Sequence, residues 1–167
     1  MKTTPLVIST FGVASTAAQS TYFSGLGQVR TFYVRDNHED LGCLTSAGKW
    51  TTNNSLCGNF TANRATPSPN YSVSWTLSTS AGPCGIETVT LKCKPGITPA
   101  VFGNWGDPAT NGGGPVPGRE ILRYGAYGVF ASSLGNNPPT PQEGPAEIRL
   151  YSASDEGKWV WLGFNGF

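Results

Sequence analysis

The sequence predicts an all-β protein, an antiparallel sandwich or barrel of about nine short strands held by two disulfides. Three observations lead to this expectation. The 167 residues include 22 glycines and 13 prolines but only 13% charged residues, a composition that favours many turns. Short runs of β-branched and aromatic residues separate those turns, and helical apolar stripes are interrupted by Gly or Pro. The four cysteines form an even set.

Each expected strand is an apolar or alternating run bounded by turn residues. In chain order we expect strands at 28–35, a hairpin within 42–52, and strands at 56–62, 71–77, 87–93, 100–104, 121–132, 147–152 and 158–164. The hairpin turns at Ser46-Ala47-Gly48. The run 87–93 alternates, so that Val89, Leu91 and Cys93 share one face. Two long connections, 103–118 and 134–145, are rich in Gly and Pro and read as insertions or functional rims.

The first 18 residues have the signature of a secretory signal peptide. Lys2 supplies a positive charge, residues 5–14 form an uncharged run too short to span a bilayer, and small residues crowd 15–18. We therefore expect cleavage after Ala18, export, and a single β-rich domain over residues 19–167. A buried N-terminal strand or helix is the alternative for the same run. No later run is long and apolar enough to predict a membrane anchor.

An even number of cysteines in an exported chain indicates disulfides, here among Cys43, Cys57, Cys84 and Cys93. Three pairings are possible, and short hairpins favour the local one, Cys43–Cys57 with Cys84–Cys93. A zinc site is not expected, because the cysteine spacings do not suit one and His38 is the only histidine.

Three tripeptides match the acceptor pattern for N-glycosylation, at Asn53, Asn59 and Asn70. If Asn59 carries a glycan, its face of the expected strand 56–62 must be open to solvent. Phe60 would then lie in the core, and the Cys43–Cys57 bridge on the outer side of the sheet.

The residues around the cysteines carry a family resemblance. The motifs are Gly42-Cys-Leu-Thr-Ser-Ala-Gly-Lys-Trp50, Cys57-Gly-Asn-Phe-Thr-Ala62, Trp75-Thr-Leu-Ser-Thr-Ser-Ala-Gly-Pro-Cys84 and Thr90-Leu-Lys-Cys93, with Phe32-Tyr33-Val34 and Tyr127-Gly-Val-Phe-Ala-Ser-Ser133. Over about residues 27–161 the chain resembles the carboxy-terminal accessory domain of fungal ribonucleases of the T-two family. The resemblance is to this domain alone and does not include the catalytic domain of those ribonucleases. The resemblance implies a β-rich domain, the local cysteine pairing and an accessory role. The 103–118 connection looks longer than that family would suggest.

Catalysis is not expected. Those ribonucleases need two histidines, one as base and one as acid, and this chain has one histidine and neither of the family's histidine motifs. The polar run 36–40 reads as a solvated turn, and the Gly-x-Ser-x-Gly pattern of a serine nucleophile is absent. With a net charge of +1 and no basic stripe, nucleic acid and anionic membranes are not expected partners. No metal or cofactor is expected.

Tryptophans give the better binding signal. Trp159 and Trp161 share one face of the strand 158–164, and its other apolar residues share the opposite face. One face would be either buried or an exposed platform of the kind on which sugar rings stack. The candidate binding residues are Trp159, Trp161, Trp50 and Trp105. We expect a secreted, non-catalytic binding module for cell-wall or other extracellular polysaccharide. The alternatives are a secreted effector or inhibitor that binds a host or competitor protein, and an enzyme of unrecognised chemistry. The oligomeric state stays open.

Overall fold

The computed structural model describes residues 22–33, 39–66, 71, 73–105, 119–125, 130–132, 137–152 and 159–167. Several expectations fall outside these described residues: the signal peptide at 1–18, His38, the acceptor site at Asn70, and most of the connection 103–118. The side chain of Trp159 is also outside them.

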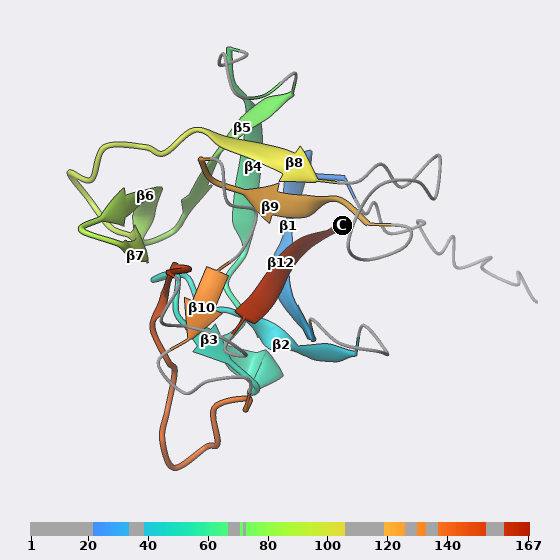
Figure 1. Cartoon of the computed structure of the whole chain (residues 1–167), viewed down its shortest axis with the longest axis vertical. Helices are drawn as coiled ribbons and strands as arrows, with labels where there is room; N and C mark the ends of the chain where they lie inside the picture. Colours follow the sequence, from blue (N-terminus) through green and yellow to red (C-terminus); the bar gives the residue numbers. More distant parts are fainter. Residues whose placement is uncertain are drawn as a thin grey trace, which may run out of the picture.

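The described residues form twelve strands and one short 3-10 turn (Figure 1). The strands are β1 (Gly25–Tyr33), β2 (Asp40–Leu44), β3 (Trp50–Thr51), β4 (Phe60–Arg64), β5 (Ser74–Thr79), β6 (Gly82–Glu87), β7 (Thr90–Cys93), β8 (Phe102–Trp105), β9 (Ile121–Arg123), β10 (Phe130–Ser132), β11 (Ile148–Leu150) and β12 (Trp159–Gly166). The turn η1 (Asn54–Leu56) joins β3 to β4. Among these residues no helix is long and apolar enough to span a membrane. The all-β prediction is confirmed.

The strand pairings, all antiparallel, close on themselves. β1 pairs with β4, β4 with β5, β5 with β8, β8 with β9, β9 with β12, and β12 with β1. A ring of this kind leaves those six strands without a free edge, so the fold is a barrel and not an open sandwich. β2 and β3 extend from β1, while β6, β7, β11 and β10 form a second path from β5 to β12.

The structure has more strands than the nine expected, and β6 is one reason. This strand was not expected from the sequence, because it contains three residues that are typical of turns: Gly82, Pro83 and Gly85. β6 nevertheless pairs with β7 along its length, and a Cβ added at Gly85 would lie 2.3 Å from the Thr98 carbonyl oxygen. The glycine here permits a close approach of two backbones and does not end the strand.

Three expected elements need correction. The strand expected at 56–62 begins only at Phe60, because Asn53 accepts a hydrogen bond from the Ser55 amide and caps the turn η1. The strand expected at 121–132 is two strands, β9 and β10, which pair with different parts of β12. Val89 does not share the buried face of β7. It lies in the β6–β7 turn and is 45% exposed, next to Thr88 with a positive φ of 61°.

β12 is apolar on both faces, and the structure buries both. Val160, Leu162 and Phe164 are fully buried in the main core, as their shared face predicts. Trp161 points to the other side and packs with Phe32 of β1 and Ile121 of β9. The strand is therefore central, buried between the barrel core and a smaller cluster outside it.

Phe23 fastens the start of the described chain to the barrel. Its ring lies 5.1 Å from that of Phe164 and 5.9 Å from that of Trp75, and it is 1% exposed. Its amide donates a 2.8 Å hydrogen bond to the buried carboxylate of Glu120. Asn104 donates a second one, at 2.9 Å, to the other carboxylate oxygen. A buried charge needs such partners, so Glu120 ties Phe23 to β8 and β9.

Both disulfides have the local pairing, Cys43–Cys57 and Cys84–Cys93, and none of the four cysteines is free. Phe60 is fully buried and Asn59 is exposed, as predicted. The Cys43–Cys57 bridge lies apart from the main core cluster, as its predicted place on the outer side of the sheet requires, but it is not exposed on the surface. Cys43 is fully buried and Cys57 is half-buried, since the turn η1 and neighbouring side chains cover the bridge.

Candidate binding site

Trp50 is not part of a binding surface. Its side chain is fully buried in the main core, and its indole N–H donates a 3.2 Å hydrogen bond to the Leu41 carbonyl. Strand β3, which carries it, pairs with β2 and bridges to Ala146. These contacts turn the indole inward, so the prediction of Trp50 as a binding residue is wrong. Burial also suits the residue type, because tryptophan is highly buried on average.

Trp105 and Trp161 do meet on the outer side of the barrel. Their ring centroids are 5.8 Å apart, and their planes are nearly perpendicular at 88°. Such edge-to-face contact is a favoured geometry for aromatic pairs. Trp161 is 6% exposed, whereas Trp105, at the end of β8, is 42% exposed. Two of the predicted tryptophans therefore lie together, and only Trp105 presents a large open surface.

Strand register assembles the rest of this surface. Phe32 pairs with Trp161, and Ile121 pairs with Trp105, so their side chains gather on one side. Gly163 of β12 lies beneath the Phe32 ring, where an added Cβ would come within 2.7 Å of a ring carbon. We call the side chains of Phe32, Trp105, Ile121 and Trp161 the outer aromatic cluster.

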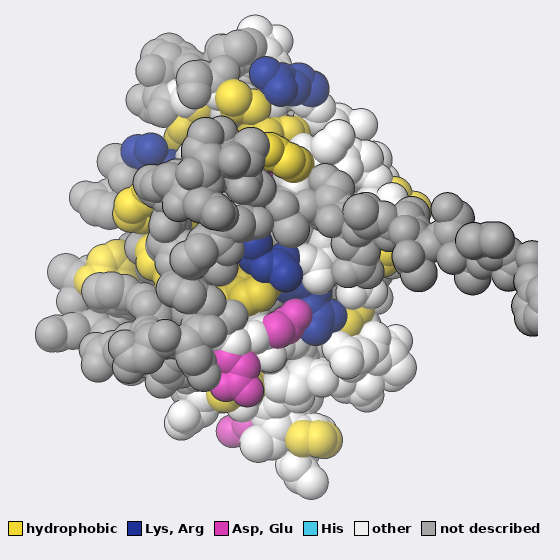
Figure 2. All heavy atoms as spheres, turned by 90° about the vertical axis from the view of Figure 1, so that its right-hand side faces the viewer, with side chains coloured by type: hydrophobic (Ala, Val, Ile, Leu, Met, Phe, Trp, Pro, Cys, Tyr) yellow, Lys and Arg dark blue, Asp and Glu magenta, His cyan; other side chains and the backbone are white. Residues whose placement is uncertain are grey.

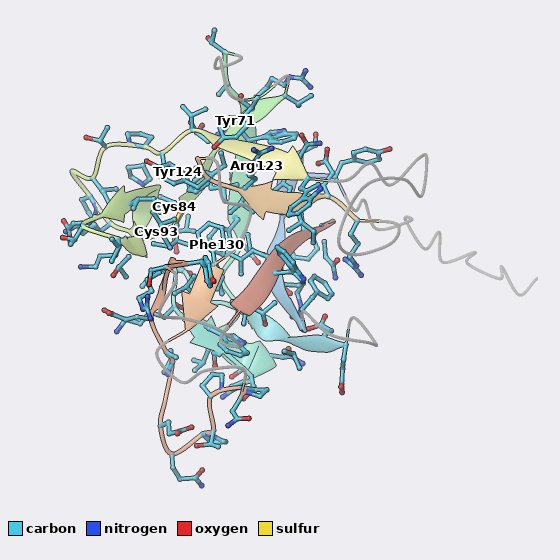
Figure 3. The ribbon with its side chains drawn as sticks, viewed as in Figure 1. Tyr71, Cys84, Cys93, Arg123, Tyr124 and Phe130 are labelled. Atoms are coloured by element: carbon cyan, nitrogen blue, oxygen red, sulfur yellow. A yellow bond between two sulfur atoms is a disulfide. The ribbon has the colours of Figure 1, made fainter. Side chains whose placement is uncertain are left out.

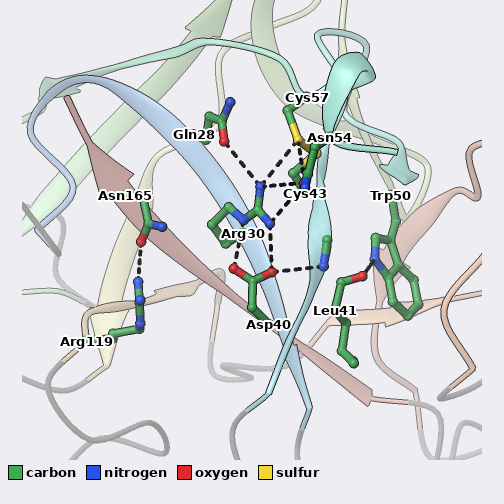
Figure 4. A network of polar contacts seen from close by, with 11 residues as sticks. Gln28, Arg30, Asp40, Leu41, Cys43, Trp50, Asn54, Cys57, Arg119 and Asn165 are labelled. Atoms are coloured by element: carbon green, nitrogen blue, oxygen red, sulfur yellow. Dashed lines mark hydrogen bonds and ion pairs between the residues drawn. A yellow bond between two sulfur atoms is a disulfide. The ribbon is translucent and has the colours of Figure 1, made fainter. Parts of the chain in front are cut away.

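Arg119 lies at the rim of the outer aromatic cluster. Its guanidinium carbon is 4.7 Å from the centre of the Phe32 ring, a cation–π contact. It also donates a hydrogen bond to the side-chain oxygen of Asn165 (Figure 4). Burial lowers the pKa of the Arg119 guanidinium; the Asp40 charge raises this pKa and the Arg30 charge lowers it, both by smaller amounts. The group remains charged, because an arginine pKa starts so far above neutral.

A second arginine–aromatic pair lies at the other end of β9. The guanidinium carbon of Arg123 is 5.7 Å from the centre of the Tyr71 ring, and Figure 3 shows the two residues side by side near β8 and β9. Tyr71 donates a 3.2 Å hydrogen bond to the Gly125 carbonyl, and burial raises the pKa of its hydroxyl. Its ring lies over Gly103 of β8, where a Cβ would be 2.3 Å from a ring carbon.

Arg30 has a different role, because its charge is already balanced. Two of its nitrogens donate to the Asp40 carboxylate at 2.9 and 3.0 Å. Further contacts reach the side-chain oxygens of Gln28 and Asn54 and the sulfur of Cys57 (Figure 4). Its side chain is only 13% exposed. This network fastens β1 to β2 and η1, and Figure 2 shows basic and acidic side chains lying next to each other on this face.

For the predicted N-glycosylation sites, the structure shows whether the asparagine side chain is exposed to solvent. Asn53 and Asn59 are both exposed, and Asn70 lies outside the described residues. The side-chain oxygen of Asn53 accepts hydrogen bonds from the amide and the hydroxyl of Ser55.

A family model for the RNase T2-like C-terminal domain matches residues 21–115. That range is more than half of the chain and contains all four cysteines, strands β1 to β8 and Trp105. The chain belongs to the RNase T2-like C-terminal domain family. Among curated proteins and among solved structures, no significant match was found. Strands β9 to β12 lie beyond the matched range, yet β9 and β12 complete the barrel.

Sequence reasoning missed part of this surface: Phe32, Arg119, Arg123 and Tyr71. One signal was present, since Ile121 and Arg123 alternate and must share one face of a strand. Nothing local indicates that aromatic rings from β1 and from residue 71 lie against those arginines. Within the described part of the chain, no three metal-ligating side chains gather into one group.

Proposed function

We propose that this member of the RNase T2-like C-terminal domain family is a secreted, non-catalytic binding module for cell-wall or other extracellular polysaccharide. One observation carries the proposal: Trp105 is 42% exposed and is held edge-on against the buried Trp161. An exposed indole that is braced in this way loses little conformational freedom when a ligand stacks on it.

The surroundings of Trp105 suit a sugar ligand. The C–H faces of a sugar ring are apolar and stack on indole, while its rim hydroxyls need hydrogen-bond partners. Arg119 and Asn165 supply polar groups beside the aromatic residues. A combination of apolar platform and polar rim is typical of binding sites for small polar rings.

Secretion is part of the proposal and rests on the signal-peptide pattern and the disulfides. Disulfides persist in oxidising compartments, and the structure has two of them. The position of Phe23 is compatible with cleavage after Ala18, because such a cut would leave this buried residue and its contacts in the mature protein. Mass spectrometry of the secreted protein would locate the new N-terminus.

The absence of catalysis is likewise proposed. It rests on the single histidine and on a family match to a C-terminal domain. We infer that binding alone is the biochemical task of residues 19–167.

A pull-down on insoluble chitin, β-glucan and cellulose tests the proposal. The wild-type protein should bind at least one of these polymers, and Trp105→Ala should abolish that binding without unfolding the protein. Val89→Ala is the matched control, because Val89 is similarly exposed, at 45%, but lies in the β6–β7 turn. Loss of binding in the control as well, or equal binding by Trp105→Ala, would contradict the proposed site.

A protein partner is the second candidate, and one observation favours it. Leu26 and Phe167 are 50% and 62% exposed, and the Phe167 amide donates a hydrogen bond to the Leu26 carbonyl, so the two residues are adjacent. Exposed apolar side chains that lie together can mark a protein interface. Binding of an extracellular protein that is lost in Phe167→Ser but kept in Trp105→Ala would favour this candidate.

A further inference from the structure

Two arginines beside the outer aromatic cluster, Arg119 and Arg123, form no ion pair with any acidic residue that the structure describes. Lys92 and Lys94 both bind Glu87, and Arg30 binds Asp40. Within the described part of the chain Arg119 and Arg123 form no ion pair, and each faces an aromatic ring instead. Glu120 lies between them in sequence, but its carboxylate accepts hydrogen bonds from Phe23 and Asn104 on the core side of the strand.

The two arginines flank the exposed tryptophan. Ile121 and Arg123 share one face of β9, about 6.6 Å apart along the strand, and Arg119 lies two residues before the strand begins. Ile121 lies between the two arginines in sequence and pairs with Trp105. The end of β8 and the start of β9 lie to the right in Figure 1, whereas Arg123 pairs with Gly103 at the opposite ends of the two strands. An extended ligand that stacks on Trp105 would therefore reach both guanidinium groups.

The chemistry of this arrangement selects a negatively charged ligand. A guanidinium group presents a planar fork of N–H donors that matches a carboxylate, and contact of its face with an aromatic ring does not use these donors. In Arg119 one nitrogen donates to Asn165, and its other N–H groups can donate to a ligand. Partial burial of Arg119 removes water from its charge, which raises the benefit of an incoming anion. The net charge of the whole chain is only +1, so the attraction would be local to this surface.

From this juxtaposition we propose that the ligand is an acidic polysaccharide, one whose sugars carry carboxylates. A sugar ring stacks on Trp105, and carboxylates on neighbouring units bind Arg119 and Arg123. The inference rests on the proposed function and narrows it from polysaccharides in general to those of the uronic-acid type.

Polygalacturonate and the same polymer after methyl esterification form the matched pair of probes, since esterification removes the charge and keeps the sugar chain. The protein should bind polygalacturonate at least about tenfold more tightly than the ester, which corresponds to one charge-assisted contact. The affinity should fall as the salt concentration rises from about 0.05 M to about 0.5 M.

Arg119→Gln and Arg123→Gln should each weaken binding to polygalacturonate by about tenfold, and should leave binding to the ester unchanged. Arg64→Gln is the control, because Arg64 is an exposed arginine on β4, outside this surface. The Arg119 side chain packs on Phe32, so melting temperatures must accompany both measurements. If Arg119→Gln does not fold, the binding of polygalacturonate and of its ester by Arg123→Gln decides whether an arginine selects the charged polymer.

Three outcomes would overturn the inference. Equal and salt-independent binding of the acidic polymer and its ester would leave polysaccharide binding intact but exclude selection for charge. Failure to bind any soluble or insoluble polysaccharide would remove the proposed function as well. Tighter binding of polyuridylate than of polygalacturonate, lost in the same two arginine variants, would identify the ligand as single-stranded nucleic acid instead.

Discussion

Replacement of Phe60 by alanine tests the orientation of β4 and the position of the core. Phe60 is fully buried in the main core cluster, whereas its neighbour Asn59 is exposed. Burial of a phenylalanine side chain contributes about 2–3 kcal/mol by transfer from water. A residual cavity of about 60 Å³ would add roughly 1.4 kcal/mol at about 24 cal/mol per Å³. Phe60→Ala should therefore lower the free energy of unfolding by about 3–5 kcal/mol.

Urea and thermal unfolding of the disulfide-bonded protein, followed by circular dichroism, measure this loss. For a domain of this length the melting temperature should fall by roughly 10–15 °C. Asn59→Gln is the control, and should change stability by less than about 0.5 kcal/mol because the side chain is exposed. Protein from a host that does not glycosylate separates packing from any effect of a glycan. A loss below about 1 kcal/mol in Phe60→Ala would refute the reasoning.

Three further predictions concern ionisation, packing and catalysis. Hydrogen bonds from Lys92, and to a smaller extent from Lys94, lower the pKa of Glu87 from its ordinary 4.5 to about 2. The charged carboxylate therefore stabilises the fold above pH 4.5, and this contribution is lost as the pH falls towards 2. Unfolding of Glu87→Gln should lack this pH dependence, which is small in the wild type because the groups are exposed. Gly163→Ala should displace the Phe32 ring, destabilise the protein by about 1–3 kcal/mol and change tryptophan fluorescence. The purified protein should not cleave polyuridylate at any pH, since one histidine cannot act as both base and acid; cleavage above a mock-purified control would contradict this.

Some features of the candidate site could be predicted because they follow from local geometry. Alternation along 158–164 predicts that Trp161 points away from Val160 and Leu162, and the structure agrees. Alternation cannot decide which face of a doubly apolar strand meets the core. That choice depends on Phe32 and Ile121, which reach β12 only through the pairings of β1 and β9. The exposure of Trp105 was equally undetermined, because it depends on what packs around the end of β8.

The sequence by itself determined the all-β class and the family resemblance, and it favoured the short-range disulfides over the two other pairings. Turn residues, β-branched runs and cysteine spacing are properties of neighbouring residues, and each of these features rests on them. Only the tertiary structure decided that the sheet closes into a barrel, that Trp50 is buried while Trp105 is open, and that two arginines stack on Phe32 and Tyr71. These features join residues far apart in the chain. The register of the paired strands fixes which side chains meet, and a shift by one residue would send each of them to the opposite face.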